Sequence, residues 1–433
     1  MSRKLLFKKA TRIEGNANID IEISNGRIRA ARFLIQEFRG FERFLKGRRV
    51  EHVPHLISRI CGLCSCSHQV ASLRAIESAM NLDVPPSVEY LRDIMVLGEW
   101  ISSHSLSYFF LSLPDVVGDQ GWIFEIAEKH PEISKDAFSI REAGLNINTL
   151  LGKRAIHPVS MGIGHFLTPP TKKNLAAVRQ MAAAIKKRAK KLITAVGRSY
   201  HNPAVITFPK DIQLNYLAFE LNGKTGAFRA FNREGTLMES FDVASFEESV
   251  TEMKTDWTLS KTPYLTHLGF PEGIMMVGPL SRSFLDNGFL ADPEVRKFSL
   301  SRQLQDRTSL SLESLDICRL LEIFWAAKRI LALLDLVDPQ EIGIQPDFEV
   351  NGRGLGVLEA PRGILVHGYL IRKGVLENLR LLVATQFNNA YINLLIRDLS
   401  QKYLKGDTIS PEGEHLIGRC IRLLDPCLSC ATH

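Results

Sequence analysis

The sequence has few cysteines for its length, and it lacks the long apolar runs and basic tracts that mark several protein classes. Seven cysteines in 433 residues are too few and too clustered for a disulfide framework. No uninterrupted apolar stretch is long enough to cross a bilayer, and the basic N-terminal segment lacks the apolar run of a secretion signal. With 54 basic and 47 acidic residues, the chain has no dense basic stretch typical of nucleic-acid binding. We therefore predict a cytoplasmic protein with no membrane span and no nucleic-acid partner.

The composition is that of a globular protein with ample core, since 45% of the residues are hydrophobic and 23% are charged. No internal repeats or low-complexity tracts occur. We predict an α+β fold that is predominantly helical, with a core bundle of long helices, an N-terminal β-hairpin region and a mid-chain mixed β insertion. The expected parts are an N-terminal β region (1–58), a first helical part (59–202), a mixed α/β insertion (203–290) and a second helical part (291–433).

Local patterns place these elements along the chain. Alternating apolar residues on both sides of Asn25-Gly26 predict a β-hairpin. Helical spacing of apolar residues predicts long helices over 87–113, 171–200, 308–336 and 371–404. The glycine-rich stretch 352–363 is not a phosphate-binding loop, because no Gly-Lys-Ser/Thr follows it. Its glycine density predicts either close backbone packing or a non-helical path around something.

Two Cys-x-x-Cys pairs lie near opposite ends of the chain, Cys61 with Cys64 and Cys427 with Cys430. Four thiolates in such pairs most often hold zinc. A separation of nearly the whole chain is unusual for a structural zinc site, and an iron–sulfur cluster or another redox metal suits tetrahedral thiolates equally well. The spacing therefore predicts a four-thiolate metal site and leaves zinc and a redox metal open.

Longer motifs surround these pairs. Arg59 and His68 flank the first pair, and Asp425 and His433 flank the second. Three further motifs follow in order: Arg-Ile-Glu-Gly at 12–15, Arg-Gly-Phe-Glu at 39–42 and Glu-Ala-Pro-Arg-Gly at 359–363. Taken alone, the first two stretches favour ion-paired strand ends. Together, the five motifs resemble those of the large subunit of nickel–iron hydrogenases, from about residue 11 to residue 433.

The resemblance implies a nickel ion held by the four thiolates. Cys64 and Cys430 would also bridge to an iron that carries carbon monoxide and cyanide, while Cys61 and Cys427 would be terminal nickel ligands. The family's reaction is the reversible heterolytic cleavage of dihydrogen, which leaves a hydride on the metals and gives a proton to a nearby base. Thiolates suit this chemistry because they are soft, electron-donating ligands.

The resemblance also implies roles for five further residues. Glu14 would be the first carboxylate of a proton relay, and Arg362 would place its charge, or act as a base, over the open metal position. Asp425 would hold Arg362 through a carboxylate–guanidinium pair. Pro361 would shape the ligand-binding wall, and His68 would form a hydrogen bond with a bridging thiolate.

Two more residues resemble ligands of a separate magnesium or iron ion near the C terminus, namely Glu42 and His433.

Two stretches depart from the pattern of the periplasmic enzymes. Ser102-Ser103-His104 stands where those enzymes have an aspartate beside the active-site arginine, and Asn16 stands where histidine is common. Both departures suggest the cytoplasmic, cofactor-coupled branch of the family, which includes deazaflavin-reducing and heterodisulfide-reductase-linked enzymes.

The resemblance implies partners as well. The paired cysteines are used by the metal centre, so we expect a small subunit with iron–sulfur clusters and a further electron-transfer subunit with flavin or iron–sulfur groups. A related subunit of respiratory NADH dehydrogenases has lost the cysteines, and their retention here argues against that role. Two alternatives remain, a regulatory protein that senses dihydrogen and a zinc-stapled structural protein.

Overall fold

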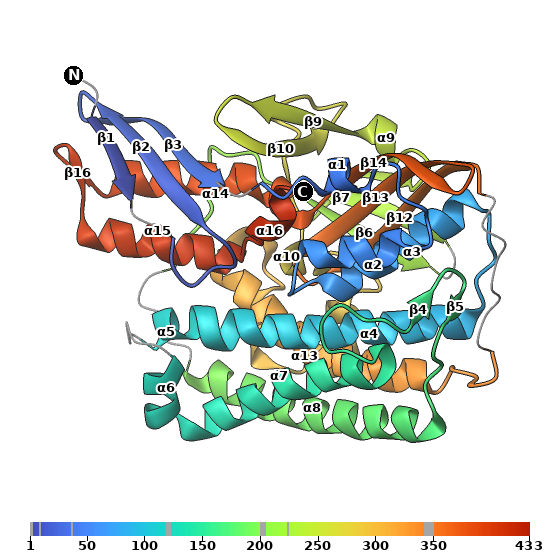
Figure 1. Ribbon diagram of the computed structural model, residues 1–433. Coiled ribbons are helices and arrows are strands. Elements are labelled where there is room, and N and C mark those ends of the chain that lie inside the picture. The colour runs from blue at the N-terminus through green and yellow to red at the C-terminus, as the bar shows by residue number, and fades with distance from the viewer. Residues whose placement is uncertain are drawn as a thin grey trace.

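The computed structural model describes residues 3–7, 10–35, 38–117, 123–199, 205–222, 225–341 and 350–433. Long helices form one side of the molecule, and small sheets with shorter helices form the other (Figure 1). Most of the buried apolar side chains belong to one continuous core that draws on both sides. This arrangement confirms the predicted α+β fold class.

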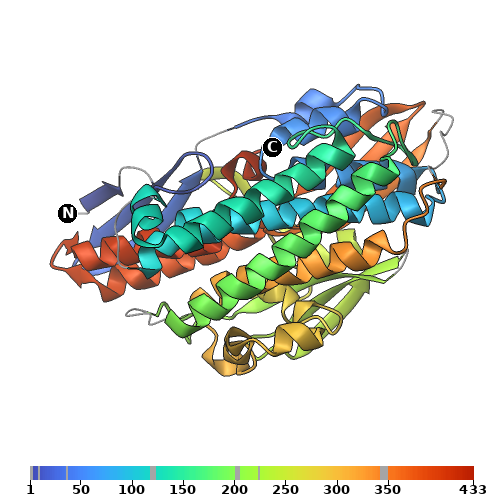
Figure 2. The same cartoon turned by 90° about the horizontal axis from the view of Figure 1, so that it is seen from below.

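Four long helices make up the bundle. They are α4 (Pro86–Ser105), α7 (Pro131–Gly152), α8 (Lys172–Ser199) and α13 (Glu313–Leu334), and Figure 2 shows them from below. α4 packs against α7 and α13, and α8 packs against the same two helices. At the α4–α7 crossing, a Cβ added to Gly144 would lie 2.8 Å from the carbonyl oxygen of Gly98, so the two backbones are in contact. The helices predicted over 87–113, 171–200 and 308–336 are confirmed.

The N-terminal hairpin is confirmed at the predicted turn. The strands are β1 (Arg3–Phe7), β2 (Ala17–Ser24) and β3 (Arg27–Ile35), paired antiparallel in that order. Asn25 and Gly26 both have positive φ, 53° and 68°, as a two-residue hairpin turn requires. β3 packs against α14 (Ala384–Lys402), which ties this region to the C-terminal part of the chain.

The mid-chain insertion is also confirmed. One sheet has the order β11 (Met275–Met276), β6 (Asn215–Asn222), β7 (Thr225–Phe231) and β8 (Leu237–Asp242), beside a hairpin of β9 (Val250–Thr255) and β10 (Thr258–Leu265). Phe219, Phe228 and Phe241 belong to a second, smaller hydrophobic core under these strands. The packed phenylalanine rings explain why a short segment rich in glycine, asparagine and proline forms a stable sheet.

The helix predicted from residue 371 is wrong over its first part. A three-stranded antiparallel sheet of β12 (Gly352–Ala360), β13 (Gly363–Arg372) and β14 (Val375–Leu382) occupies this region. Lys373 and Gly374, with φ of 49° and 70°, form the turn between the last two strands, and helix α14 begins only at Ala384. Apolar residues in a short segment fit the periodicity of either a helix or a strand. Here pairing with the neighbouring strand determines that residues 375–382 are β structure.

The remaining described elements are short, apart from α3 and α15. They are α1 (Phe41–Leu45), α2 (Val53–Ile57), α3 (Ser65–Ala79), α5 (Leu113–Val116), α6 (Ile123–Lys129), α9 (Phe246–Ser249), α10 (Pro279–Arg282), α11 (Pro293–Arg296), α12 (Ser299–Gln303), α15 (Pro411–Leu424), α16 (Leu428–Ala431), the 3-10 helices η1 (Ser58–Ile60), η3 (Phe289–Ala291) and η4 (Arg307–Ser309), the π-helix η2 (Leu106–Ser112) that continues α4, and the strands β4 (Met161–Gly162), β5 (His165–Phe166), β15 (Leu404–Lys405) and β16 (Thr408–Ile409). The C terminus follows α16 near the middle of the molecule (Figure 1). In the described part of the chain, no helix is both long and apolar enough to cross a membrane.

Glycines in β12 allow this strand to lie directly on the backbone of α3. A Cβ added to Gly354 would lie 2.0 Å from the carbonyl oxygen of Ala75, and one added to Gly356 would lie 1.9 Å from that of Ala71. The close backbone packing predicted for residues 352–363 is therefore confirmed. This contact fixes the helix that follows the first cysteine pair against the strand that leads to Arg362.

Gly356→Ala is therefore expected to lower the free energy of unfolding by about 3 kcal/mol, because the added methyl group must push two backbones apart. Chemical denaturation measures this change. Gly368→Ala in the neighbouring strand is the matched control, since its Cβ would first meet the mobile end of Leu355 at 3.1 Å. Equal losses in the two variants would contradict the proposed backbone contact.

Candidate metal centre

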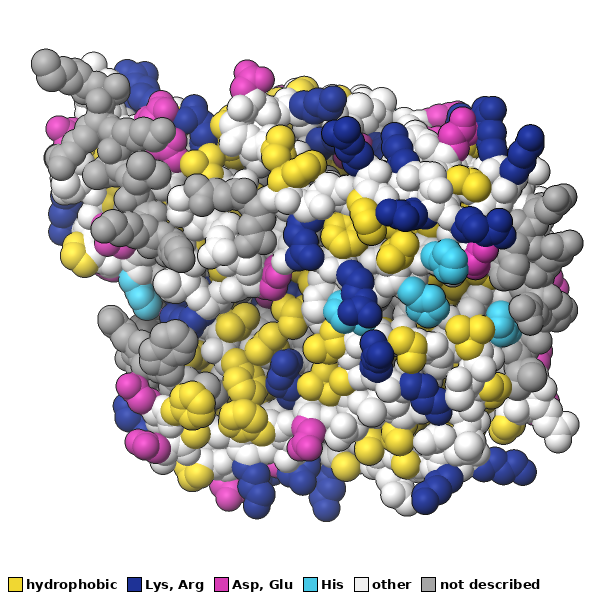
Figure 3. Space-filling model, viewed as in Figure 1, with side chains coloured by type: hydrophobic (Ala, Val, Ile, Leu, Met, Phe, Trp, Pro, Cys, Tyr) yellow, Lys and Arg dark blue, Asp and Glu magenta, His cyan; other side chains and the backbone are white. Residues whose placement is uncertain are grey.

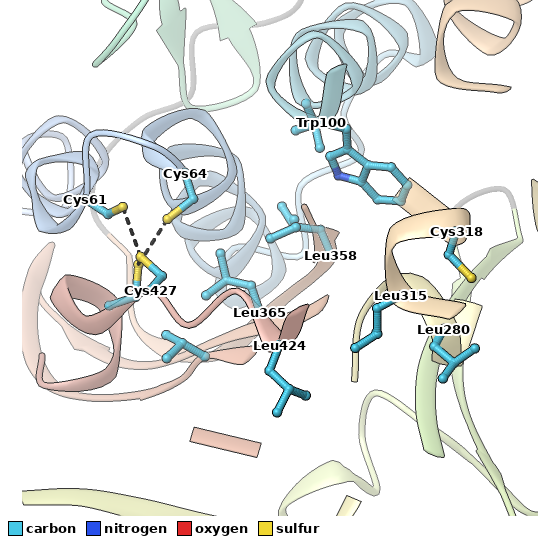
Figure 4. Close-up of a cluster of buried hydrophobic side chains, with 14 of the residues drawn as sticks. Cys61, Cys64, Trp100, Leu280, Leu315, Cys318, Leu358, Leu365, Leu424 and Cys427 are labelled. Carbon is cyan, nitrogen blue, oxygen red and sulfur yellow. Dashed lines mark hydrogen bonds between the residues drawn. The ribbon is translucent and has the colours of Figure 1, made fainter. Parts of the chain in front are cut away.

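The four paired cysteines, 366 residues apart in the chain, come together in one buried cluster. The Cys61 and Cys427 sulfurs are 3.3 Å apart, those of Cys64 and Cys430 are 3.0 Å apart, and those of Cys427 and Cys430 are 3.0 Å apart. All four sulfurs lie within 4.8 Å of one another. Figure 4 shows the side chains of Cys61 and Cys64 pointing toward Cys427. Cys64 and Cys427 are the N-caps of α3 and α16, so two helix starts face each other across the site.

The electrostatics of the cluster fit a bound cation. Hydrogen bonds from the thiols of Cys427, Cys430 and Cys64 hold the pKa of Cys61 well below its usual range. Burial raises the pKa of Cys430 well above that range. Four buried thiolates at such short separations repel one another, and a divalent metal removes that repulsion. The donor set therefore suits a thiophilic metal such as nickel.

Arg362 lies over this cluster and is held on three sides. Its Nε donates to the carbonyl oxygen of Asp425 at 2.9 Å, its Nη2 to the Asp425 carboxylate at 3.0 Å and its Nη1 to Ser103 Oγ at 3.2 Å. Burial alone would lower the pKa of Arg362, but the charges of Asp425 and of the cysteines raise it well above its usual value. The guanidinium therefore presents a fixed positive charge to the sulfurs.

Within the predicted stretch Ser102-Ser103-His104, Ser103 is the residue that contacts Arg362. His104 turns away and lies 3.0 Å from the carboxylate of Glu322 on α13. Pro361 lies between Ala360 and Arg362, which both line a cavity of about 20 Å³ beside the sulfurs.

Glu14 is joined to the second cysteine pair through both its backbone and its side chain. Its backbone forms an isolated β-bridge with Cys427, and its carboxylate accepts hydrogen bonds from the amide of Ser429 at 3.1 Å and from the Ser429 hydroxyl. Arg12 bonds to Asp115 at 2.6 Å. The 12–15 motif therefore contacts the last motif and α5. Arg12 is ion-paired, as predicted, but it lies before β2 and its partner Asp115 lies on a helix, so this pair does not join two strand ends.

His68 also lines the small cavity beside the cysteines. Its Nδ1 lies 3.1 Å from His367 Nε2, and His367 Nδ1 lies 3.0 Å from the hydroxyl of Tyr369, which donates to Ser72. Burial lowers the pKa of His68 to about 4, so its ring is neutral near pH 7. This buried row of hydrogen bonds fixes the orientation of the His68 ring at the wall of the cavity that Cys64, Cys427 and Cys430 also line.

The last residues of the chain are anchored to the segment that carries Glu42. His433 Nε2 lies 3.7 Å from the Glu42 carboxylate, and His433 Nδ1 lies 2.8 Å from the carbonyl oxygen of Cys430. The amide of Arg39 donates to the carbonyl oxygen of Thr432 at 2.9 Å. The structure thus brings together the two residues predicted to bind a second ion.

Sequence patterns gave no role to Glu99 on α4, which serves the first cysteine pair. Its carboxylate accepts hydrogen bonds from the amide of Cys66 at 2.8 Å, the amide of Ser67 at 3.1 Å and the Ser67 hydroxyl. It therefore caps the start of α3 directly after Cys64, and burial raises its pKa to about 7. The one available signal was that Glu99 is the only charged residue in the otherwise apolar stretch 94–101 of this helix. Cys66 is buried outside the four-sulfur cluster, and burial raises its pKa well above the usual value, so it remains a thiol.

The chain matches a family model described as nickel-dependent hydrogenase over residues 39–132 and 232–433. It is 31% identical to a protein of the F420-non-reducing hydrogenase of Methanothermobacter marburgensis, covering 99% of this chain and 94% of that protein. It is 30% identical to the alpha subunit of sulfhydrogenase 2 of Pyrococcus furiosus (98% and 97% covered), and 28% identical to the beta subunit of the NAD-reducing hydrogenase HoxS of Cupriavidus necator (100% and 95%).

Solved structures agree with this result. The fold matches a crystal structure of an NAD⁺-reducing [NiFe]-hydrogenase in the H₂-reduced state with a TM-score of 0.89 and 26% identity, covering 100% of this chain and 99% of that chain. A [NiFeSe]-hydrogenase of Dm. baculatum, at 21% identity and a TM-score of 0.76, shares the fold over the full length of both chains.

Proposed function

The chain belongs to the nickel-dependent hydrogenase family, and from that premise we propose how its residues cleave dihydrogen. It is the catalytic large subunit of a nickel–iron hydrogenase, an oxidoreductase that acts on dihydrogen. The observation that carries the proposal is the buried cluster of four sulfurs with one fixed guanidinium above it and one carboxylate beside it.

In this proposal the four cysteines would hold the nickel–iron centre, Cys61 and Cys427 as ligands of nickel alone and Cys64 and Cys430 as ligands shared with an iron carrying carbon monoxide and cyanide. When bound, such a centre would supply a site that polarises dihydrogen and takes up its electrons. Cys64, Cys427 and Cys430 line the small cavity together with apolar Ile364 and Leu365, a space that would suit small diatomic ligands of the metals. His68 orients and tunes the bridging thiolates from the same cavity.

Arg362 supplies a permanent positive charge where the substrate bond is polarised, and this charge stabilises a developing negative charge. Asp425 fixes its direction through two contacts, one from the carboxylate and one from the backbone. Pro361 restricts the backbone directly before Arg362, because a proline ring fixes φ. These residues position the charge and leave proton transfer to a different group.

Glu14 takes that role as the first proton acceptor, because its carboxylate lies at the start of α16 and Ser429 links it to the segment between Cys427 and Cys430. Glu14→Gln keeps the shape and can still accept from the Ser429 amide, but it cannot carry a proton. We expect its rate of dihydrogen oxidation to fall about 100-fold or more with nickel retained. Glu22→Gln, at a partly exposed carboxylate on β2 that pairs with Arg32, is the matched control and should keep the wild-type rate. A wild-type rate for Glu14→Gln would exclude this residue from proton transfer.

A second ion, magnesium or iron, is proposed between Glu42 and His433. The support is that both side chains converge beside the end of the chain while the backbone of Thr432 is bound by Arg39. Such an ion would lock the last motif over the metal centre. Metal analysis that separates tightly bound magnesium from nickel and iron tests this assignment.

The relatives are named as subunits of multi-subunit hydrogenases, and an iron–sulfur small subunit with a further flavin or iron–sulfur subunit is the proposed electron route. The segment carrying the first cysteine pair reaches the surface at exposed Arg59 and Gly62, so buried Cys61 and Cys64 would hold the metals beneath that face. Histidine and basic side chains gather on the same face over α2 and α3 (Figure 3). None of the seven cysteines forms a disulfide, which supports a reducing cytoplasm as the proposed compartment.

The complex purified with its partner subunits tests the function. We expect nickel, infrared bands of metal-bound carbon monoxide and cyanide, and reduction of a viologen dye by dihydrogen. Zinc alone in matured protein would support the structural alternative, and intact bands with very slow turnover would support a dihydrogen sensor.

A further inference from the structure

A buried arginine outside the recognised motifs makes contact with the backbone that carries Arg362. Arg282 ends the short helix α10, and 4% of it is exposed. Its Nε and Nη2 donate to the two carboxylate oxygens of Glu322 at 2.7 and 2.8 Å, and its Nη1 donates to Glu359 at 2.8 Å. The guanidinium carbon lies 4.0 Å from the centre of the Trp100 ring. Figure 4 shows Trp100 on the far side of Leu358 from the cysteines.

Two more hydrogen bonds from Arg282 reach the residues directly before Arg362. Nη1 donates to the carbonyl oxygen of Ala360 at 3.0 Å, and Nη2 donates to that of Pro361 at 3.0 Å. The backbone around α10 touches the same turn, because a Cβ added to Gly278 would lie 2.5 Å from the carbonyl oxygen of Arg362. The path of the chain into Arg362 is therefore set by Arg282 and its neighbours.

The same cluster also reaches the other residue that binds Arg362. Glu322, held by two nitrogens of Arg282, lies 3.0 Å from His104 Nε2. His104 adjoins Ser103, whose hydroxyl accepts from Arg362. Arg282 thus contacts the backbone directly before Arg362. It is also connected, through Glu322 and α4, to the serine that binds the Arg362 guanidinium.

A buried ion cluster by itself says little about stability, since replacing one with apolar residues is often neutral. Here the geometry adds a different requirement. Five donor contacts in fixed directions, two of them to consecutive carbonyls, require a planar guanidinium, and an ammonium group provides only a compact point charge. We propose that Arg282 is a positioning residue that fixes Arg362 over the metal centre, an inference that rests on the proposed role of Arg362.

A double-mutant cycle with Arg362→Lys tests this proposal in the purified complex. Arg362→Lys alone must lower kcat, and if it does not, the proposed function of Arg362 fails before Arg282 is considered. Arg282→Lys is then expected to lower kcat about 10–100-fold with KM and nickel content retained. In the Arg362→Lys background the same change should have little further effect, because it acts through Arg362.

Arg92→Lys is the matched control, since Arg92 is equally buried and binds Glu77 and the carbonyl oxygen of Gly162. Its effect on kcat should be small and the same in both backgrounds. Equal losses from Arg282→Lys in both backgrounds, or loss of nickel, would overturn the positioning role and leave Arg282 a structural residue.

Chemical rescue gives a second measurement. Arg282, Glu322 and Glu359 line a cavity of about 440 Å³ that also includes exposed Asn287 and Arg329, so it opens to the surface. Millimolar guanidinium should therefore raise kcat of Arg282→Ala in a saturable manner, with no such effect on Arg92→Ala or on Arg282→Ala combined with Arg362→Lys. Failure of guanidinium to act on nickel-containing Arg282→Ala would contradict the proposal.

Discussion

Cys64→Ser is expected to abolish dihydrogen oxidation and to remove nickel from the purified complex. The Cys64 sulfur lies 3.0 Å from that of Cys430, and the four sulfurs are the complete thiolate set of the cluster. A serine hydroxyl stays protonated near pH 7 and is a hard donor, so it cannot replace a soft thiolate. Activity should fall below about 1% of wild type, since loss of residues that only support a metal ligand already costs about 10–100-fold. Metal analysis and dye reduction by dihydrogen measure both effects.

Cys66→Ala provides the matched control for this change. Cys66 lies in the same motif and is equally buried, but it is outside the four-sulfur cluster and keeps its proton. Its loss should cost some stability and leave nickel content and rate near wild type. If Cys66→Ala lost nickel as fully as Cys64→Ser, or if Cys64→Ser kept it, the assignment of ligands would be wrong.

The metal site could be predicted from the sequence because the residues that form each half of it are close together in the chain. Each pair of cysteines lies within one turn, and the motifs at 12–15 and 359–363 carry their chemistry in adjacent residues. The spacing of the cysteine pairs alone did not decide between zinc and a redox metal. The five motifs in their order favoured a nickel–iron centre. In the structure, Arg362 shares a cavity with three of the cysteines, and the Glu14 carboxylate binds Ser429 between the last two.

The missed features depend on contacts between distant segments. Glu99 reaches the start of α3 from α4, and Arg282 reaches Pro361 across 79 positions. No spacing rule links such residues. The strand β14 was missed for a related reason, because pairing with β13 rather than its own periodicity determines its conformation.

Arg362→Lys is the second change with a large expected effect. The substitution keeps a positive charge but replaces a planar fork with a single ammonium group. Arg362 makes three contacts in different directions, to the carbonyl and carboxylate of Asp425 and to Ser103. One ammonium nitrogen cannot reproduce all three, so the charge will move from the position where it stabilises polarisation of the substrate. We expect kcat to fall about 100–1,000-fold.

Nickel should be retained in Arg362→Lys, because Arg362 is not a ligand and all four sulfurs remain. This separates the variant from Cys64→Ser, in which rate and metal are lost together. KM for dihydrogen should change little if Arg362 acts on the transition state rather than on the bound substrate. Arg92→Lys controls for the replacement of a buried arginine, and it should leave kcat near wild type. An unchanged rate in nickel-containing Arg362→Lys would remove this guanidinium from the mechanism, and loss of nickel would make it a residue of metal assembly.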